Sequence, residues 1–169
     1  KYEEAEVTTA RTITWQWKAG GRGHEECATT YNSVAVVLRK QGKYEKAKAM
    51  YAKAYAMFLE GRVRGVAEVG TAYTGLADVL RKQGKYEKAK AMYEKALAIQ
   101  LKALGPEHAD VANTYNSLAI VLKKQGKYEK ATAMYEKALA IFLTALGPEH
   151  AEVATTYPGL ADVLRKQGK

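Results

Sequence analysis

The strongest constraint on the fold is an internal repeat of 42 residues. The tetrapeptide Gln-Gly-Lys-Tyr occurs at residues 41–44, 83–86 and 125–128, and the chain ends on Gln-Gly-Lys. Residues 85–126 and 127–168 are identical at 33 of 42 positions. A fixed period of this length is typical of stacked repeat proteins, in which each unit covers the apolar side of its neighbour. A single-domain enzyme built around one site does not have such a sequence.

Each repeat contains two segments with the periodicity of an amphipathic helix. In one repeat, Val111, Tyr115, Leu118 and Leu122 follow a spacing of about 3.6 residues and form one apolar stripe. A glycine ends this segment, and a second helical segment begins at the tyrosine that follows. No part of the chain shows the sustained alternation of a half-buried strand. The chain is therefore predicted to be all-α.

The prediction is a single repeat array of eight helices. The helices are expected at residues 2–18, 25–40, 44–60, 66–82, 86–104, 107–124, 128–146 and 149–166. The array covers residues 1–169 and is divided into a degenerate half-repeat (1–23), three full repeats (24–65, 66–107 and 108–149) and a final half-repeat (150–169).

The composition excludes several classes of protein. Apolar residues make up 47% of the chain and charged residues 27%, which is ordinary for a globular protein. The chain has 1 cysteine, and hence no disulfide framework, and no apolar run near the ~18 residues that a membrane span needs. We expect a cytoplasmic protein without membrane contact. The sequence shows no nucleophile–base pair, no phosphate-binding glycine loop and no paired carboxylates, so neither catalysis nor a cofactor is expected.

His108 and His150 occupy the same position in successive repeats. Equivalent atoms in stacked helix pairs lie roughly 10 Å apart, whereas a zinc ion needs every ligand within ~2.3 Å. No metal site is therefore expected, and both histidines are predicted to mark helix starts. Cys27 stands where later repeats have valine, which predicts a small buried residue rather than a reactive thiol.

The aligned repeats share the pattern Tyr-x-x-Leu-Ala-x-x-Leu-x-x-x-Gly-x-Tyr-x-x-Ala-x-x-x-Tyr-x-x-Ala, which runs from Tyr115 to Ala138 in the third copy. It closely resembles the tetratricopeptide repeat, and the 42-residue length with Leu-Gly-Pro-Glu-His resembles the kinesin light chain and nephrocystin-3 type. The resemblance implies an α-solenoid of eight antiparallel helices in a right-handed superhelix. It also implies a protein-interaction scaffold that binds a peptide or protein segment in a concave groove. The repeat tyrosines are expected to be core residues.

The resemblance implies which residues line this groove. The first helix of each repeat lines the concave face, and the residues one and five after the repeat tyrosine point into it. Together with the basic residues three positions further on, the candidate groove residues are Asn32, Val36, Arg39, Thr74, Asp78, Arg81, Asn116, Ile120 and Lys123. Asn32 and Asn116 match the asparagine that members of this family use to hydrogen-bond a peptide backbone, whereas Thr74 and Pro158 do not.

Odd and even repeats differ at these positions. Odd repeats have Asn-Ser followed by an apolar residue, Val36 or Ile120, and even repeats have glycine followed by Asp78 or Asp162. One interpretation is a groove that alternates apolar and acidic contacts. The other is duplication of a two-repeat ancestor without a functional difference. Pro158 lies inside a predicted helix and is expected to kink it or move its start, because an interior proline costs ~3 kcal/mol.

The chain has 27 basic and 18 acidic residues, for a net charge of +9. Basic residues recur at the ends of the first helices and in the turns that follow, so stacking places them along one edge. This edge favours acidic peptide or protein partners through electrostatic steering. Nucleic acid is a rival interpretation, and a solvated edge without a partner is a third. The nearby aspartates and the absence of interleaved aromatic residues count against nucleic acid.

The runner-up function is a structural array that associates with itself. The sequence begins in the second helix of a repeat and ends in the first helix of another, which leaves apolar residues at each end without a neighbour. A head-to-tail contact with a second copy would cover them and form a homo-oligomer. The candidate contact residues are Tyr2, Ala5, Ile13, Leu160 and Leu164.

Overall fold

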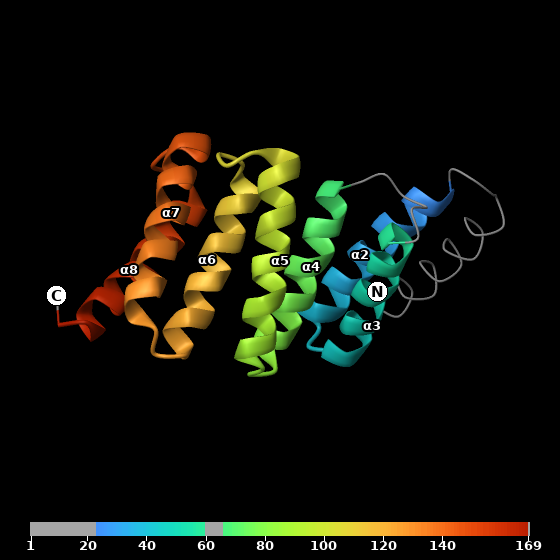
Figure 1. Ribbon diagram of the computed structural model, residues 1–169, viewed down its shortest axis with the longest axis horizontal. Coiled ribbons are helices and arrows are strands. Elements are labelled where there is room, and N and C mark those ends of the chain that lie inside the picture. Colours follow the sequence, from blue (N-terminus) through green and yellow to red (C-terminus); the bar gives the residue numbers. More distant parts are fainter. Residues whose placement is uncertain (1–22, 60–65, 169) are drawn as a thin grey trace.

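The helices lie side by side in one row and are joined pairwise into hairpins (Figure 1). The computed structural model describes residues 23–59 and 66–168, and within these ranges all the regular secondary structure is α-helix. The helices are α2 (Gly23–Lys40), α3 (Tyr44–Leu59), α4 (Val66–Lys82), α5 (Tyr86–Leu104), α6 (Ala109–Lys124), α7 (Tyr128–Leu146) and α8 (Ala151–Lys166). The all-α prediction is confirmed for these ranges, and the helix predicted at residues 2–18 lies outside them.

The two helices of each hairpin are joined by a turn in which a glycine is left-handed. Gly84, between α4 and α5, has a φ of 73°. Lys85 N–H donates to the Leu80 carbonyl across it at 2.9 Å, which is the Schellman arrangement that ends a helix. Gly42 and Gly126 adopt the same conformation. The repeated Gln-Gly-Lys sequence therefore produces the same turn in successive hairpins.

Two helices begin later than the sequence predicted. α6 begins at Ala109 rather than residue 107, and α8 begins at Ala151 rather than residue 149. The cause is an N-cap: His108 has extended backbone, and its Nδ1 accepts the backbone N–H of Asp110 at 3.1 Å. His150 caps α8 in the same way. An N-cap residue stands outside the helix that it begins, so the helix-start role of the histidines is confirmed while the boundary is corrected.

We expect His108→Ala to lower the free energy of unfolding by about 1 kcal/mol, because the Asp110 N–H loses its acceptor. His108→Asn should keep most of the stability, since asparagine is a preferred N-cap residue. Urea unfolding followed by circular dichroism measures both variants. An equal loss from both would contradict the capping role.

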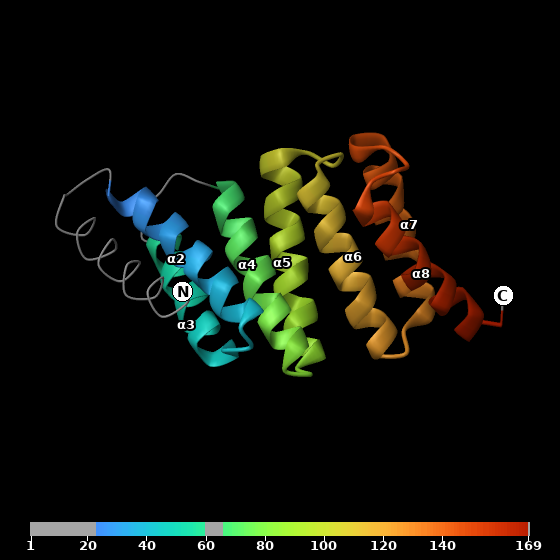
Figure 2. The ribbon, with the colours of Figure 1, turned by 180° about the vertical axis from the view of Figure 1, so that it is seen from behind.

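The first helices of the repeats contact one another, and the second helices do not. α2 contacts α4, α4 contacts α6, and α6 contacts α8, whereas within the described ranges α3, α5 and α7 make no mutual contacts. The row is therefore closer packed on the side of α2, α4, α6 and α8, which we call the inner face. Figure 2 shows the row from the side opposite to that of Figure 1.

Tyrosines occupy two kinds of position in the packing. Tyr51, Tyr93 and Tyr135 are at most 1% exposed, which confirms the predicted core role for these three. A second set is half-buried, and a lysine ammonium from the following helix lies 5.5–5.9 Å from each ring centroid: Lys53 over Tyr31, Lys95 over Tyr73 and Lys137 over Tyr115. Such contacts contribute ~0.5–1 kcal/mol at exposed sites. These tyrosines therefore close the surface of the interfaces rather than fill their centres.

Pro158 lies inside α8, which continues through it from Ala151 to Lys166. Pro158 was expected to kink the helix or move its start. It does not move the start, because α6 has no proline and begins at the corresponding residue. The carbonyl left without a backbone donor belongs to Ala154, an exposed residue that water can reach.

Candidate functional site

A hollow of about 190 Å³ lies on the inner face where α2, α4 and α6 meet. Sites for whole small molecules typically measure ~300–1,000 Å³, so this hollow has the size for a single side chain. Its lining residues are Val36, Arg39, Tyr51, Thr71, Thr74, Gly75, Asp78, Gln100, Asp110 and Asn113.

The hollow brings together four of the predicted groove residues, namely Val36, Arg39, Thr74 and Asp78. The other predicted residues lie outside its lining: Asn32, Arg81, Asn116, Ile120 and Lys123. Asn32 is only 7% exposed, and its Oδ1 has no hydrogen-bond partner within the described part of the chain. Four of the nine predicted residues therefore lie together at the α2–α4 contact, and the other five do not line this hollow.

Asp78 is surrounded by groups that neutralise it. Its carboxylate lies 3.0 Å from Arg39 Nη1 of the neighbouring α2 and 3.2 Å from Arg81 Nη2 of its own helix. The Tyr93 hydroxyl donates to the same carboxylate, and burial together with the charge of Asp78 raises the pKa of Tyr93. Only 15% of the Asp78 side chain is exposed. Asp78 therefore holds the inner face together and does not present a free negative charge.

Asp162 occupies the equivalent position in α8 and pairs in the same way. It lies 3.1 Å from Lys123 Nζ of α6 and 2.9 Å from Arg165 Nη2 of its own helix. In both places a basic residue of an odd repeat reaches the aspartate of the next even repeat. The interpretation of alternating apolar and acidic contacts therefore needs correction, because the acidic positions are occupied by ion pairs between neighbouring first helices.

The hydrogen bonds from Arg165 and Lys123 lower the pKa of Asp162 to about 2. Because the pKa is lower in the folded chain than the unperturbed ~3.9, the stabilisation from this group is present above pH ~4 and is lost as the pH falls through about 2. A carboxyl ¹³C titration should show this depressed value. Lys123→Gln should raise the Asp162 pKa toward its unperturbed value, and an unchanged pKa in that variant would contradict the cross-helix pair.

The glycines of the even repeats make room for the fully buried tyrosines. A Cβ on Gly75 would lie 2.2 Å from the Tyr51 ring, and one on Gly159 would lie 2.8 Å from the Tyr135 ring. The odd repeats have serine at this position, as at Ser117. The tyrosine equivalent to Tyr51 and Tyr135 is then Tyr93, and its hydroxyl bonds to Asp78. Packing against these tyrosines therefore explains why the even repeats have glycine at this position.

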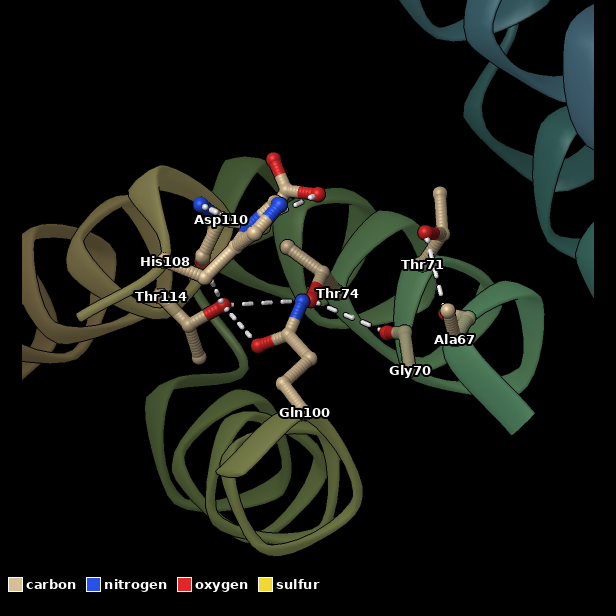
Figure 3. Close-up of polar contacts among 8 residues, drawn as sticks. All are labelled: Ala67, Gly70, Thr71, Thr74, Gln100, His108, Asp110 and Thr114. Atoms are coloured by element: carbon tan, nitrogen blue, oxygen red, sulfur yellow. Dashed lines mark hydrogen bonds and ion pairs between the residues drawn. The ribbon is translucent and has the colours of Figure 1, made fainter. Parts of the chain in front are cut away.

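Gln100 of α5 is a buried polar residue that the sequence analysis missed. It is 3% exposed, and its Oε1 accepts a hydrogen bond from Thr114 Oγ1 at 2.6 Å. Thr114 lies 3.4 Å from Thr74 Oγ1, which donates to the Gly70 carbonyl. Figure 3 shows this network, with the Gln100 amide between α4 and α6. When the repeats are aligned, Gln100 stands where the preceding and following repeats have Phe58 and Phe142. This departure from the repeat is the signal that the sequence analysis missed.

The basic edge is partly neutralised. Arg39 and Lys123 turn toward the inner-face aspartates. Along the turns, Lys127 lies 3.4 Å from Glu87, and Gln83 donates to Glu45 at 2.7 Å. Lysines at the helix ends, Lys40, Lys82 and Lys124, remain exposed. The edge is still basic, but part of the charge counted from the sequence belongs to internal pairs.

The predicted self-association residues divide into two groups. Tyr2, Ala5 and Ile13 lie outside the described residues, while Leu160 and Leu164 of α8 are only partly exposed. The most exposed large apolar side chain on α8 is Tyr157, at 50%. Ala154 and Ala161 are exposed on the same helix, whereas their counterparts Ala112 and Ala119 in α6 are fully buried.

The described residues contain no group of three or more histidine, cysteine or acidic side chains that could hold a metal ion. Cys27 is 1% exposed, in agreement with the predicted small buried residue. None of the helices within residues 23–59 and 66–168 is long and apolar enough to cross a membrane.

Comparison with known sequences identifies the repeat. A family model described as tetratricopeptide repeat matches residues 1–60, 68–144 and 110–169. No curated protein sequence matches the chain significantly.

Solved structures share the fold over most of the chain. BtubC (BKLC) from P. vanneervenii superposes with a TM-score of 0.83 at 25% identity, over 98% of this chain and 66% of that protein. A Podospora anserina protein described as a kinesin light chain with nearly identical TPR-like repeats gives 0.75 at 20% identity, over 98% of this chain and 79% of that one. The apo form of RapI gives 0.76 at 22%, over 85% of this chain and 50% of that one. The predicted likeness to the kinesin light chain type is confirmed in structure.

Proposed function

The chain belongs to the tetratricopeptide repeat family, and from this we propose that its inner face binds an extended segment of a partner protein. Arrays of this family generally bind proteins and are generally non-catalytic. We also propose that the array consists of eight helices in a right-handed superhelix and that the protein is cytoplasmic. The observation that supports it most directly is the hollow at the α2–α4–α6 contact, which is lined by four residues expected in the groove.

The charges on the inner face favour an acidic partner. Five cations lie around the two aspartates: Arg39, Arg81, Lys123, Arg165 and Lys166. Since each aspartate is shared between cations, an excess of positive charge remains. A segment with carboxylates along α6 and α8, where Lys123, Arg165 and Lys166 surround Asp162, would meet this excess and would be steered toward it. The weaker alternative, nucleic acid, depends on the basic edge, where Glu45 and Glu87 already pair with neighbouring side chains.

A library of random peptides selected on the immobilised protein tests this proposal. Thr71 lines the hollow and is exposed on α4. Thr71→Arg should therefore lower the affinity of the selected peptides about tenfold, because the longer side chain fills the opening of the hollow. Ala91→Arg, on the exposed side of α5, is the matched control and should leave affinity unchanged. Failure to select any peptide, or equal loss from both variants, would overturn the proposal, and preferential capture of a generic RNA would favour the nucleic-acid alternative.

A second candidate function is self-association through α8, and the exposed Tyr157 and Ala161 support it. In α6 the corresponding face is covered by α7, so a helix of the same repeat type from a second copy would complete the contact. Sedimentation over a hundredfold range of concentration should show association that Ala161→Glu abolishes. A monomer throughout would reject it.

A further inference from the structure

We propose that Gln100 selects a carboxamide side chain, that of asparagine or glutamine, in the bound segment and holds it in the inner-face hollow. This inference rests on the proposed function and names the chemistry of one contact within it.

The first argument is that Gln100 is buried at a position where the neighbouring repeats have phenylalanine. Phe142, one repeat later, is fully buried and packs against Ala112 and Val153. An amide in such a place costs free energy unless its hydrogen bonds are made. Oε1 has its donor in Thr114, whereas Nε2 is not one of the buried atoms without a partner, so it is open to the hollow that Gln100 lines. Gln100 is therefore a buried residue that is paired at Oε1 and lines the hollow.

The second argument is a matching change on the facing helix. Gly70 stands where other repeats have Ala28 and Ala112, and a Cβ on Gly70 would lie 2.8 Å from Gln100 Cγ. The glycine therefore admits the longer amide side chain next to α4. Two departures from the repeat meet at one place, where they weaken a helix and an apolar core, and the hydrogen bond from Thr114 offsets part of that loss. A ligand contact would offset the rest.

The third argument is the charge around the hollow. A carboxylate there would face Asp110, and a cation would face Arg39 and the N–H donors of Gln100. An apolar side chain would leave those donors unpaired. A carboxamide is uncharged, offers its oxygen to Gln100 Nε2 and offers its own N–H groups to the Asp110 carboxylate. The volume of about 190 Å³ suits one such side chain.

The experiment compares random-peptide selections on the wild-type chain and on the variant Gly70→Ala/Gln100→Phe, which copies the residues of the neighbouring repeat. Wild-type binders should share an asparagine or glutamine at one position, and changing it to aspartate, lysine or leucine should weaken binding about tenfold. The double variant should still select peptides but without this preference. Gln100→Met, which keeps the length of the side chain and removes the donors, should lose the preference as well.

The outcomes separate the two proposals. If wild-type binders carry no carboxamide preference, or if the variants keep it, the role of Gln100 is rejected while peptide binding stands. If the wild-type chain selects no peptides, both proposals fail. Circular dichroism establishes that each variant is folded. The double variant should also unfold at a higher temperature than the wild type, because it replaces a glycine and a buried polar side chain by the alanine and phenylalanine of the repeat, and a lower temperature would argue that Gln100 is structural.

Discussion

Gly75→Ala should destabilise the protein by about 3 kcal/mol, the upper part of the range for overpacking a core. The added Cβ would lie 2.2 Å from the Tyr51 ring, and Tyr51 is 1% exposed, so the ring must leave its packed position for the added methyl group to fit. In an open helix the same change stabilises by ~1 kcal/mol through helix propensity. The sign of the effect alone therefore tests whether the two helices approach as closely as the structure shows.

Two controls isolate the contact in this experiment. Ser117→Ala alters the same repeat position where a Cβ is already present, and it should change stability little. In the Tyr51→Ala background, Gly75→Ala should cost much less than in the wild type, because neighbouring residues are not additive. Urea unfolding monitored by circular dichroism gives all the values. A Gly75→Ala protein more stable than the wild type would refute the close packing.

Asp78→Ala should destabilise by about 3 kcal/mol, as expected when one partner of a mostly buried charge network is removed. The variant leaves Arg39 and Arg81 side by side without their shared carboxylate and removes the acceptor of the buried Tyr93 hydroxyl. Asp162→Ala is the matched control. Asp162 is 28% exposed and its partner Arg165 is 80% exposed, so water screens the charges that remain and the loss should be small.

Chemical unfolding of the two aspartate variants under identical conditions makes this comparison. Equal losses would mean that burial does not distinguish the two sites and would contradict the network around Asp78. The Arg39→Gln/Asp78→Ala double variant should recover part of the stability, since it removes one of the unpaired cations. Charge reversal at Asp78 is therefore unsuitable as a probe of binding alone, because it changes the framework of the inner face as well.

The helices and their pairing could be predicted because the repeat states the same information several times. Each copy carries the apolar stripe, the glycine that ends the first helix and the tyrosine that begins the second. The starts of α6 and α8 were misplaced because a histidine is an uncommon N-cap and the residues before it are compatible with a helix. Local pattern alone does not reveal which side chain accepts the first free N–H.

The site was predictable only in part, for a different reason. Family resemblance placed Val36, Arg39, Thr74 and Asp78 on one surface, and they do line one hollow. It could not show that Asp78 is neutralised, because Arg39 lies 39 residues earlier and approaches only through the stacking of α2 on α4. Gln100 was overlooked because its helix lies behind the inner face. Comparing the repeats with one another at that position, rather than with a family pattern, would have found it.

The ion pairs between first helices are unevenly distributed, and this has a consequence. Within the described ranges an arginine or lysine ties α2 to α4 and α6 to α8, while α4 and α6 are linked by the hydroxyls of Thr74 and Thr114. The contact between α4 and α6 should therefore be less sensitive to salt than the two contacts that carry ion pairs. Because the hollow lies where α4 and α6 meet, a segment bound in it would contact both helices. Bending of the array at this place would therefore weaken its binding.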